Sequence, residues 1–253
     1  MATSGTVRGE ERKAAILTAV NAEGSVQLDE LATRLEVSPM TVRRDLDELE
    51  SEGLLRRVRG GAIAITGPRL FGERRAVRTR AKQTIAAKAA TLLPASGAIA
   101  LDASSTVGTL AGALNAHGDL VVVTNSYENF SALGASGGIT PVLIGGEQDP
   151  TTGSFIGRIA CDAADSLLYQ TFFTSAAAVH PVHGSSEVSL PESQVKRAFA
   201  ARSTRTVLCA DSSKLGAVAV ASAFSFDEVD VLITELDPAD TALDAYRGAV
   251  DLL

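Results

Sequence analysis

The hydrophobic positions near the start of the chain recur at helical spacing in two successive segments. In the first, apolar residues about one turn apart predict a helix over residues 10–21, and Gly24 is placed to end it. In the second, the apolar positions i, i+3, i+4 and i+7 are Leu28, Leu31, Ala32 and Leu35. This spacing predicts a second helix, after which residues 36–38 form a tight turn.

A third helix is predicted directly after this turn. Ser38 can cap it, because its hydroxyl can accept a free backbone amide, and Pro39 suits the first turn. Its apolar stripe, at i, i+4 and i+7, is Val42, Leu46 and Leu49. Every basic residue of the helix lies off this stripe in the N-terminal half, so that half is expected to enter a DNA groove. The residues expected to face DNA are Ser38, Met40, Thr41, Arg43 and Arg44.

The C-terminal half of the same helix is acidic, and DNA would repel it. Its acidic residues are Asp45, Asp47, Glu48, Glu50 and Glu52. For this segment alone, an ordinary amphipathic helix with a solvated charged face is the commoner alternative. The helices before it and the segment after it favour the DNA-binding interpretation.

A short basic hairpin is predicted after the third helix. Leu54 and Leu55 start a strand, and Gly60-Gly61 suits the tip of a hairpin. The arginines of this segment, expected to contact phosphate oxygens, are Arg56, Arg57 and Arg59. The tip is placed to reach the minor groove. Three helices followed by a basic hairpin predict a winged helix-turn-helix.

From Gly97 onward, short apolar strands alternate with helical segments. This alternation predicts a Rossmann-like α/β domain built on a parallel sheet. The expected strands are 98–101, 120–123, 141–144, 171–174, 206–210 and 229–234. The expected helices are 106–115, a segment ending near 133, 194–202 and 239–246.

Four of these strands end in a polar cluster. The clusters are DASST at 102–106, TNS at 124–126, GGE at 145–147 and DSSK at 211–214. Any one of them would be unremarkable, because such residues populate many loops. In a parallel sheet, however, all four lie at the carboxyl edge, where α/β folds bind ligands.

The chemistry of the clusters matches a phosphorylated sugar. Ser104–Thr106 precede a helix, so their hydroxyls and amides can hold a phosphate. Asp102 accepts hydrogen bonds and suits sugar hydroxyls. Lys214 is a point charge for an anion, and Gly145-Gly146 lets the backbone approach a ligand closely.

The segment Thr41–Ala62, TVRRDLDELESEGLLRRVRGGA, resembles the signature of the DeoR family of bacterial transcriptional regulators. The resemblance implies a winged DNA-binding domain followed by a sensor for phosphorylated sugars, similar in fold to ribose-5-phosphate isomerase. It also implies a homo-oligomer, a dimer or higher, assembled through the sensor. A phosphorylated sugar would release such a repressor from its operator.

The second half resembles the family's sensor through shorter motifs: the clusters at 102–106, 124–126, 145–146 and 211–214, and the helix segment Val195–Arg197. Gln148-Asp149 replaces a basic residue common after Gly-Gly, and Ser175–Val179 replaces a Gly-rich segment. These departures leave the effector's identity open. The residues expected to bind it are Asp102, Ser104, Ser105, Thr106, Thr124, Asn125, Ser126, Gly145, Gly146, Lys196, Asp211 and Lys214.

Charge is distributed unevenly along the chain. The net charge is −7 overall, but residues 54–82 carry +8, between −5 for residues 1–53 and −10 for residues 83–253. DNA binding should therefore depend on a local basic stripe. We expect a DNA-binding domain at 1–63, a linker at 64–81 and a sensor domain at 82–253. The linker arginines suit extra phosphate contacts and a solvated hinge equally well.

Several other classes of protein find no support. No apolar run approaches the roughly 20 residues of a membrane span, and the N-terminus lacks a signal-peptide core, so we expect a cytoplasmic protein. Cys161 and Cys209 are too few for a disulfide framework. His180 and His183 have no third partner at metal-site spacing, and no nucleotide motif is present. We expect neither a metal nor a cofactor.

Three functions fit the sequence. The first is a transcriptional regulator, most simply a repressor of sugar-metabolism genes, without enzymatic activity. The second is an isomerase-like enzyme with an appended DNA-binding module, which would turn over sugar phosphates. The third is a constitutive DNA-binding protein whose sensor is inactive, in which no sugar phosphate would change DNA affinity.

Overall fold

The computed structural model describes residues 3–51, 53–64, 70–114, 119–133 and 138–253. Among them, contacts define two compact units. The first contains the described residues up to 64 together with 72–78, and the second contains 70–71 and 79–253. Residues 65–69 of the expected linker, with Arg69 among its arginines, lie outside the described residues.

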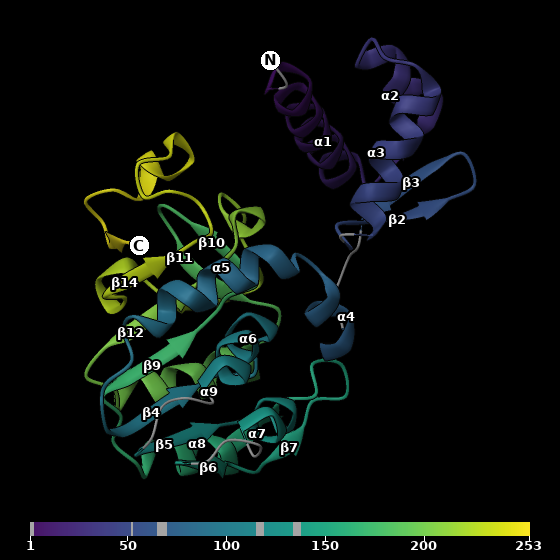
Figure 1. Ribbon diagram of the computed structural model, residues 1–253. Helices are drawn as coiled ribbons and strands as arrows, with labels where there is room; N and C mark the ends of the chain where they lie inside the picture. The colour runs from purple at the N-terminus through teal and green to yellow at the C-terminus, as the bar shows by residue number, and fades with distance from the viewer. Residues whose placement is uncertain (1–2, 52, 65–69, 115–118, 134–137) are drawn as a thin grey trace. The chain divides into compact units, whose positions relative to one another are not determined.

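The first unit is a winged helix-turn-helix. Its elements are α1 (Thr3–Glu23), β1 (Ser25–Gln27), α2 (Leu28–Arg34), α3 (Pro39–Ser51), β2 (Leu55–Val58) and β3 (Gly61–Ala64). The strands form an antiparallel sheet in the order β1-β3-β2, of which β2 and β3 are labelled in Figure 1. The three expected helices and the hairpin are present. Helix α1 begins well before residue 10, and β1 was not predicted.

Local sequence explains the start of α3 and the packing of the wing. The Ser38 hydroxyl accepts a hydrogen bond from the Thr41 amide at 3.1 Å, as expected of a cap. The apolar stripes of the helices are buried in one core with Leu55 and Ala62 of the hairpin. A Cβ added at Gly61 would lie 2.0 Å from the Val26 carbonyl oxygen, so β1 approaches β3 too closely for any side chain there.

The second unit is built on a seven-stranded sheet whose neighbouring strands all pair in parallel, in the order β15-β14-β12-β9-β4-β5-β6. The strands are β4 (Gly97–Leu101), β5 (Leu120–Thr124), β6 (Ile139–Leu143), β9 (Thr171–Thr174), β12 (Thr206–Cys209), β14 (Val231–Ile233) and β15 (Asp251–Leu252). The Rossmann-like prediction is confirmed.

Helices cover both faces of this sheet. One face packs against α5 (Thr79–Ala90), α6 (Ser105–Ala113) and α7 (Tyr127–Leu133), and the other against α8 (Gly157–Asp165) and α9 (Leu190–Ala201) (Figure 1). Successive residues of a central strand serve opposite cores: Phe173 packs with α5 and α6, and Phe172 packs with α9. This alternation is the two-residue period of a strand.

The order of the strands places a ligand site. The chain runs outward from β4 through β5 and β6, then returns to place β9 on the other side of β4. From β9 it continues outward through β12 and β14. The direction therefore reverses between β4 and β9, and ligands of open α/β sheets bind at such a switch point, beyond the carboxyl ends of the strands.

Several smaller elements were not predicted. A second, antiparallel sheet has the order β10-β11-β13, from β10 (Ala178–His180), β11 (Gly184–Glu187) and β13 (Ala221–Phe224). A hairpin pairs β7 (Glu147–Gln148) with β8 (Phe155–Ile156). The remaining short helices are α4 (Phe71–Ala76), η2 (Ser212–Lys214), η3 (Phe226–Glu228) and η4 (Thr241–Tyr246), the last in place of the helix expected at 239–246.

Candidate functional site

The N-terminal half of α3 presents the side chains expected to face DNA. Met40 is 58% exposed, and Arg43 and Arg44 are exposed, whereas Thr41 is half-buried. The Ser38 hydroxyl lies within 2.8 Å of the Thr41 hydroxyl while it caps the helix. Only three of the five residues therefore offer a largely exposed side chain that is not engaged in capping.

The acidic half of α3 is held by partners within the first unit. Asp45 is buried, and its carboxylate receives two hydrogen bonds from Arg12 of α1, at 2.5 and 2.9 Å. The hydrogen bond to Asp45 raises the pKa of Arg12. Lys13 pairs with Glu48 at 3.2 Å. The prediction that Asp45 repels DNA is therefore wrong, because its carboxylate is paired with Arg12 of α1, and the helical spacing does not reveal this partner.

The wing directs its arginines in two directions. Arg56 and Arg59 are exposed. Arg57 is directed back to α3, where its guanidinium pairs with Asp47 and its backbone amide donates to Glu50 at 2.7 Å. Consecutive residues of a strand point to opposite faces, so Arg56 and Arg57 cannot share one surface. This geometry directs Arg56 away from α3, and Arg59 is exposed in the turn that follows β2.

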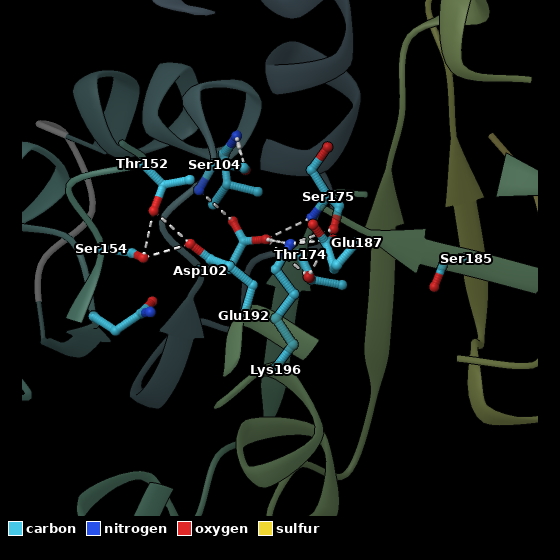
Figure 2. Close-up of polar contacts among 12 residues, drawn as sticks. Asp102, Ser104, Thr152, Ser154, Thr174, Ser175, Ser185, Glu187, Glu192 and Lys196 are labelled. Carbon is cyan, nitrogen blue, oxygen red and sulfur yellow. Dashed lines mark hydrogen bonds and ion pairs between the residues drawn. The ribbon is translucent and has the colours of Figure 1, made fainter. Parts of the chain in front are cut away.

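At the switch point, Asp102 links the end of β4 to the end of β9 (Figure 2). Its carboxylate accepts hydrogen bonds from the amides of Ser104 and Ser175, at 2.9 and 2.8 Å, and from the Thr174 hydroxyl at 2.9 Å. It also pairs with Lys196 of α9 at 2.9 Å. This fully buried carboxylate is thus engaged inside the protein, where sequence analysis expected a contact to sugar hydroxyls.

Lys196 is the centre of a buried ionic network. Besides Asp102, its ammonium bonds Glu187 of β11 at 2.6 Å and the Ser175 carbonyl at 2.8 Å. Burial alone would lower the pKa of Lys196, but the two carboxylates raise it above its usual value. Burial raises the pKa of Asp102, but the charge of Lys196 and the hydrogen bonds to the carboxylate together outweigh this and hold the pKa below its usual value. For Glu187, burial prevails and the pKa is raised.

The Ser104–Thr106 loop lies at the start of α6, as expected for a phosphate-binding loop, but its side chains are buried. The Ser104 hydroxyl accepts from the Val107 amide at 3.1 Å and so caps the helix. The Ser105 hydroxyl accepts from Lys82 of α5 at 3.1 Å. Lys82 itself is buried, and it was not among the residues expected to form the site.

Lys214 reaches the same edge from β12. Its ammonium donates to the Ser175 hydroxyl at 2.9 Å, and its side chain is half-buried. Burial lowers the pKa of Lys214, although the nearby Asp211 carboxylate opposes the shift. The Asp211 carboxylate caps the short turn by accepting from the Ser213 amide.

The other two clusters complete the edge. Thr124, Asn125 and Ser126, at the end of β5, are almost fully buried. A Cβ added at Gly146 would meet the Ile156 carbonyl oxygen at 2.5 Å, whereas nothing lies within 4 Å of one added at Gly145. Close backbone packing thus requires glycine at the second position. Three of the clusters follow the adjacent strands β4, β5 and β6. The fourth follows β12, which is separated from β4 by β9.

Sequence analysis missed several polar residues of this edge. Thr174 ends the predicted strand 171–174 and Ser175 directly follows it, so the signal that marked the four named clusters could have found them. Glu187 and Glu192 reach the edge from β11 and α9, and the sequence pattern holds no signal for them. Two further residues, Thr152 and Ser154, belong to the unpredicted hairpin.

Within the described residues, no helix is long and apolar enough to span a membrane. No group of three or more histidine, cysteine or acidic side chains in that part of the chain is arranged to hold a metal ion.

Comparison with known proteins connects both units to one family. A DeoR-like helix-turn-helix domain matches residues 12–67, and a DeoR C-terminal sensor domain matches residues 77–236. A solved D-ribose-5-phosphate isomerase in complex with phospho-erythronic acid aligns with 54% of this chain and 54% of its own, at 15% identity and a TM-score of 0.41.

Two relatives that align with this chain over most of their length are repressors. The lactose phosphotransferase system repressor of Streptococcus mutans is 33% identical over 242 residues, 92% of this chain and 95% of the relative. The glycerol-3-phosphate regulon repressor of Escherichia coli is 29% identical over 232 residues, 90% of this chain and 91% of the relative. The chain therefore belongs to the DeoR family of DNA-binding transcriptional regulators.

Proposed function

We propose that this regulator represses sugar-metabolism genes and leaves its operator when a phosphorylated sugar binds the sensor unit. The observation that carries the proposal is the carboxyl edge of the sheet, where half-buried Lys214 follows β12 and the first turn of α6 follows β4, the two strands that flank β9. A dianionic phosphate gains from both an ammonium and helix amides, whereas a free sugar gains little. The names of the repressor relatives support this class of effector.

In the sensor unit, some residues contact the effector directly and others hold the site in position. We assign phosphate binding to Lys214 and to the amides of Ser105 and Thr106. Asp102 and Lys196 hold the strand ends in place through their mutual ion pair. In the first unit, we assign base contacts to the N-terminal half of α3 and phosphate contacts to Arg56 and Arg59.

The proposed assembly is a homo-oligomer, at least a dimer, acting on operators in the cytoplasm. One reading helix buries little DNA surface, and paired readers on repeated half-sites are the usual way to gain specificity. Light scattering at micromolar concentration should give the mass of two or more chains. A monomer that binds the operator fully would contradict this assembly.

One screen tests the proposed function. The full chain is heated with sugar phosphates and with the corresponding free sugars, and its melting temperature is followed. Only phosphorylated compounds should raise it, because a ligand of the folded form stabilises that form. The same compounds should weaken operator binding in a titration and should not be converted by the protein. A stabilising compound without effect on operator binding would contradict the repressor mechanism, and turnover would favour an enzyme.

A further inference from the structure

The loop between β7 and β8 places two hydroxyls on a single carboxylate. Thr152 and Ser154 are buried, and both donate a hydrogen bond to Oε1 of Glu192, a buried residue in the first turn of α9 (Figure 2). The Thr152 bond measures 2.7 Å, and the two hydroxyl oxygens lie 2.9 Å apart. Two gauche hydroxyls on neighbouring carbons of a sugar present their oxygens in a similar way, because staggered torsions set their separation.

A second, independent feature lies against the same loop. The Asn125 side chain is 2% exposed, and its amide nitrogen donates to the Phe155 carbonyl at 3.0 Å, one residue beyond Ser154. The backbone amide of Phe155 donates to the Asn125 carbonyl at 2.8 Å. The Oδ1 atom of the Asn125 side chain is buried and has no hydrogen-bond partner in the structure. A buried acceptor of this kind is costly unless a donor reaches it.

Both features call for hydrogen-bond donors. Glu192 as a carboxylate and Oδ1 of Asn125 only accept hydrogen bonds, and Glu192 would repel a phosphate. Sugar hydroxyls are donors without charge. The phosphate of a bound effector therefore belongs near Lys214, and its hydroxyls belong near Glu192.

We propose that Glu192 and Asn125 form a subsite for vicinal hydroxyls of the effector, and that Thr152 and Ser154 occupy this subsite in the effector-free protein. The inference rests on the proposed function and deepens it. Binding exchanges the two loop hydroxyls for two sugar hydroxyls, so Glu192 keeps its hydrogen bonds, and the loop has to withdraw. The loop is thus an internal competitor that sets the affinity for the effector.

The first experiment compares sugar phosphates with inorganic phosphate. Dissociation constants are measured by calorimetry for ribose 5-phosphate, fructose 6-phosphate, glucose 6-phosphate and inorganic phosphate. Wild-type protein should prefer at least one sugar phosphate. Glu192→Gln should reduce that preference by about ten- to a hundredfold, without weakening inorganic phosphate. The control is Asp244→Asn, which removes an exposed acid paired with Arg247 and should leave the preference unchanged.

The second experiment removes the competitor. The double variant Thr152→Val/Ser154→Ala should bind the preferred sugar phosphate about tenfold more tightly, because Glu192 has lost its internal donors. Weaker binding in this variant, or an unchanged preference in Glu192→Gln, would overturn the subsite. If wild-type protein bound none of these compounds, both the proposed function and the subsite would be contradicted.

Discussion

At the scale of single residues, Lys214 is proposed to bind a phosphate as an ammonium, although its burial disfavours the charged form. Burial lowers its pKa in the effector-free protein, whereas a bound phosphate would favour the ammonium and raise the pKa again. Between these two pKa values, effector binding takes up a proton, so affinity should fall as the pH rises through the lower one. The decline in effector affinity should begin at a pH below the usual pKa range of lysine.

Calorimetry across a pH series, in two buffers of different ionisation enthalpy, measures this proton uptake. Lys214→Met should bind the effector weakly at every pH and lose the alkaline decline, while operator binding stays intact. Lys214→Arg should keep its affinity to higher pH, because a guanidinium does not titrate there. An alkaline decline that survived in Lys214→Met would assign the titration to another group.

The buried ion pair between Arg12 and Asp45 gives a stability prediction for the first unit. Asp45→Asn leaves the Arg12 guanidinium, whose side chain is only 21% exposed, without its carboxylate. We expect the free energy of unfolding of this unit to fall by about 2–4 kcal/mol, measured by urea unfolding of the full chain. The matched control is Glu23→Gln, which breaks an exposed pair with Arg34 and should cost less than about 1 kcal/mol. Equal losses would mean that the buried pair does not brace α3.

Single residues also show how far the sequence predicts the sensor site. The position of Asp102 follows from the pattern, because a polar residue directly after a buried strand must lie at the sheet edge. Its partners do not follow, because Lys196 and Ser175 are 94 and 73 residues away along the chain, and only the fold brings them together. Asp102 was therefore placed correctly, but its engagement inside the protein was not foreseen.

At the scale of elements, the arginines of the wing have two roles. We expect Arg56 and Arg59 to contact DNA, whereas Arg57 binds the hairpin to α3. Arg56→Ala/Arg59→Ala should lower the salt slope of operator binding by about two units, because both side chains are exposed. Arg57→Ala should change the slope by less than about half a unit, since its guanidinium pairs with Asp47. Operator titrations over a range of salt concentrations measure each slope, and equal slopes for Arg57→Ala and the double variant would contradict this division.

The elements that the sequence predicts share a strong period, and those it misses do not. Helix α3 has an apolar stripe, a cap and a proline, and its start at Pro39 was predicted. Strand β11 reads GSSE and is buried throughout, so no alternation marks it. Gly184 of this strand approaches the Phe224 carbonyl oxygen so closely that an added Cβ would lie 2.0 Å from it. A requirement of this kind arises from tertiary packing and leaves no local pattern.

At the scale of the whole molecule, repression and sensing must be linked by one free energy. If the effector releases the operator, operator DNA must weaken the effector by the same factor. We expect a factor of about 5 to 150, as is common for such couplings. Calorimetry with the effector, in the presence and absence of operator DNA, measures it. Equal effector affinity in both titrations would show that the sensor unit does not control the first unit.

The network around Lys196 has a consequence for how the sensor edge can open. One ammonium holds segments from β4, β9 and β11 onto α9, so none of these strand ends can detach alone without breaking a hydrogen bond or ion pair of the buried Lys196. The amide protons of Ser104 and Ser175, both bonded to Asp102, should therefore exchange with deuterated water at one shared rate. If the edge opens as a unit, binding of a sugar phosphate would change all of these strand ends together, in one step within a single chain.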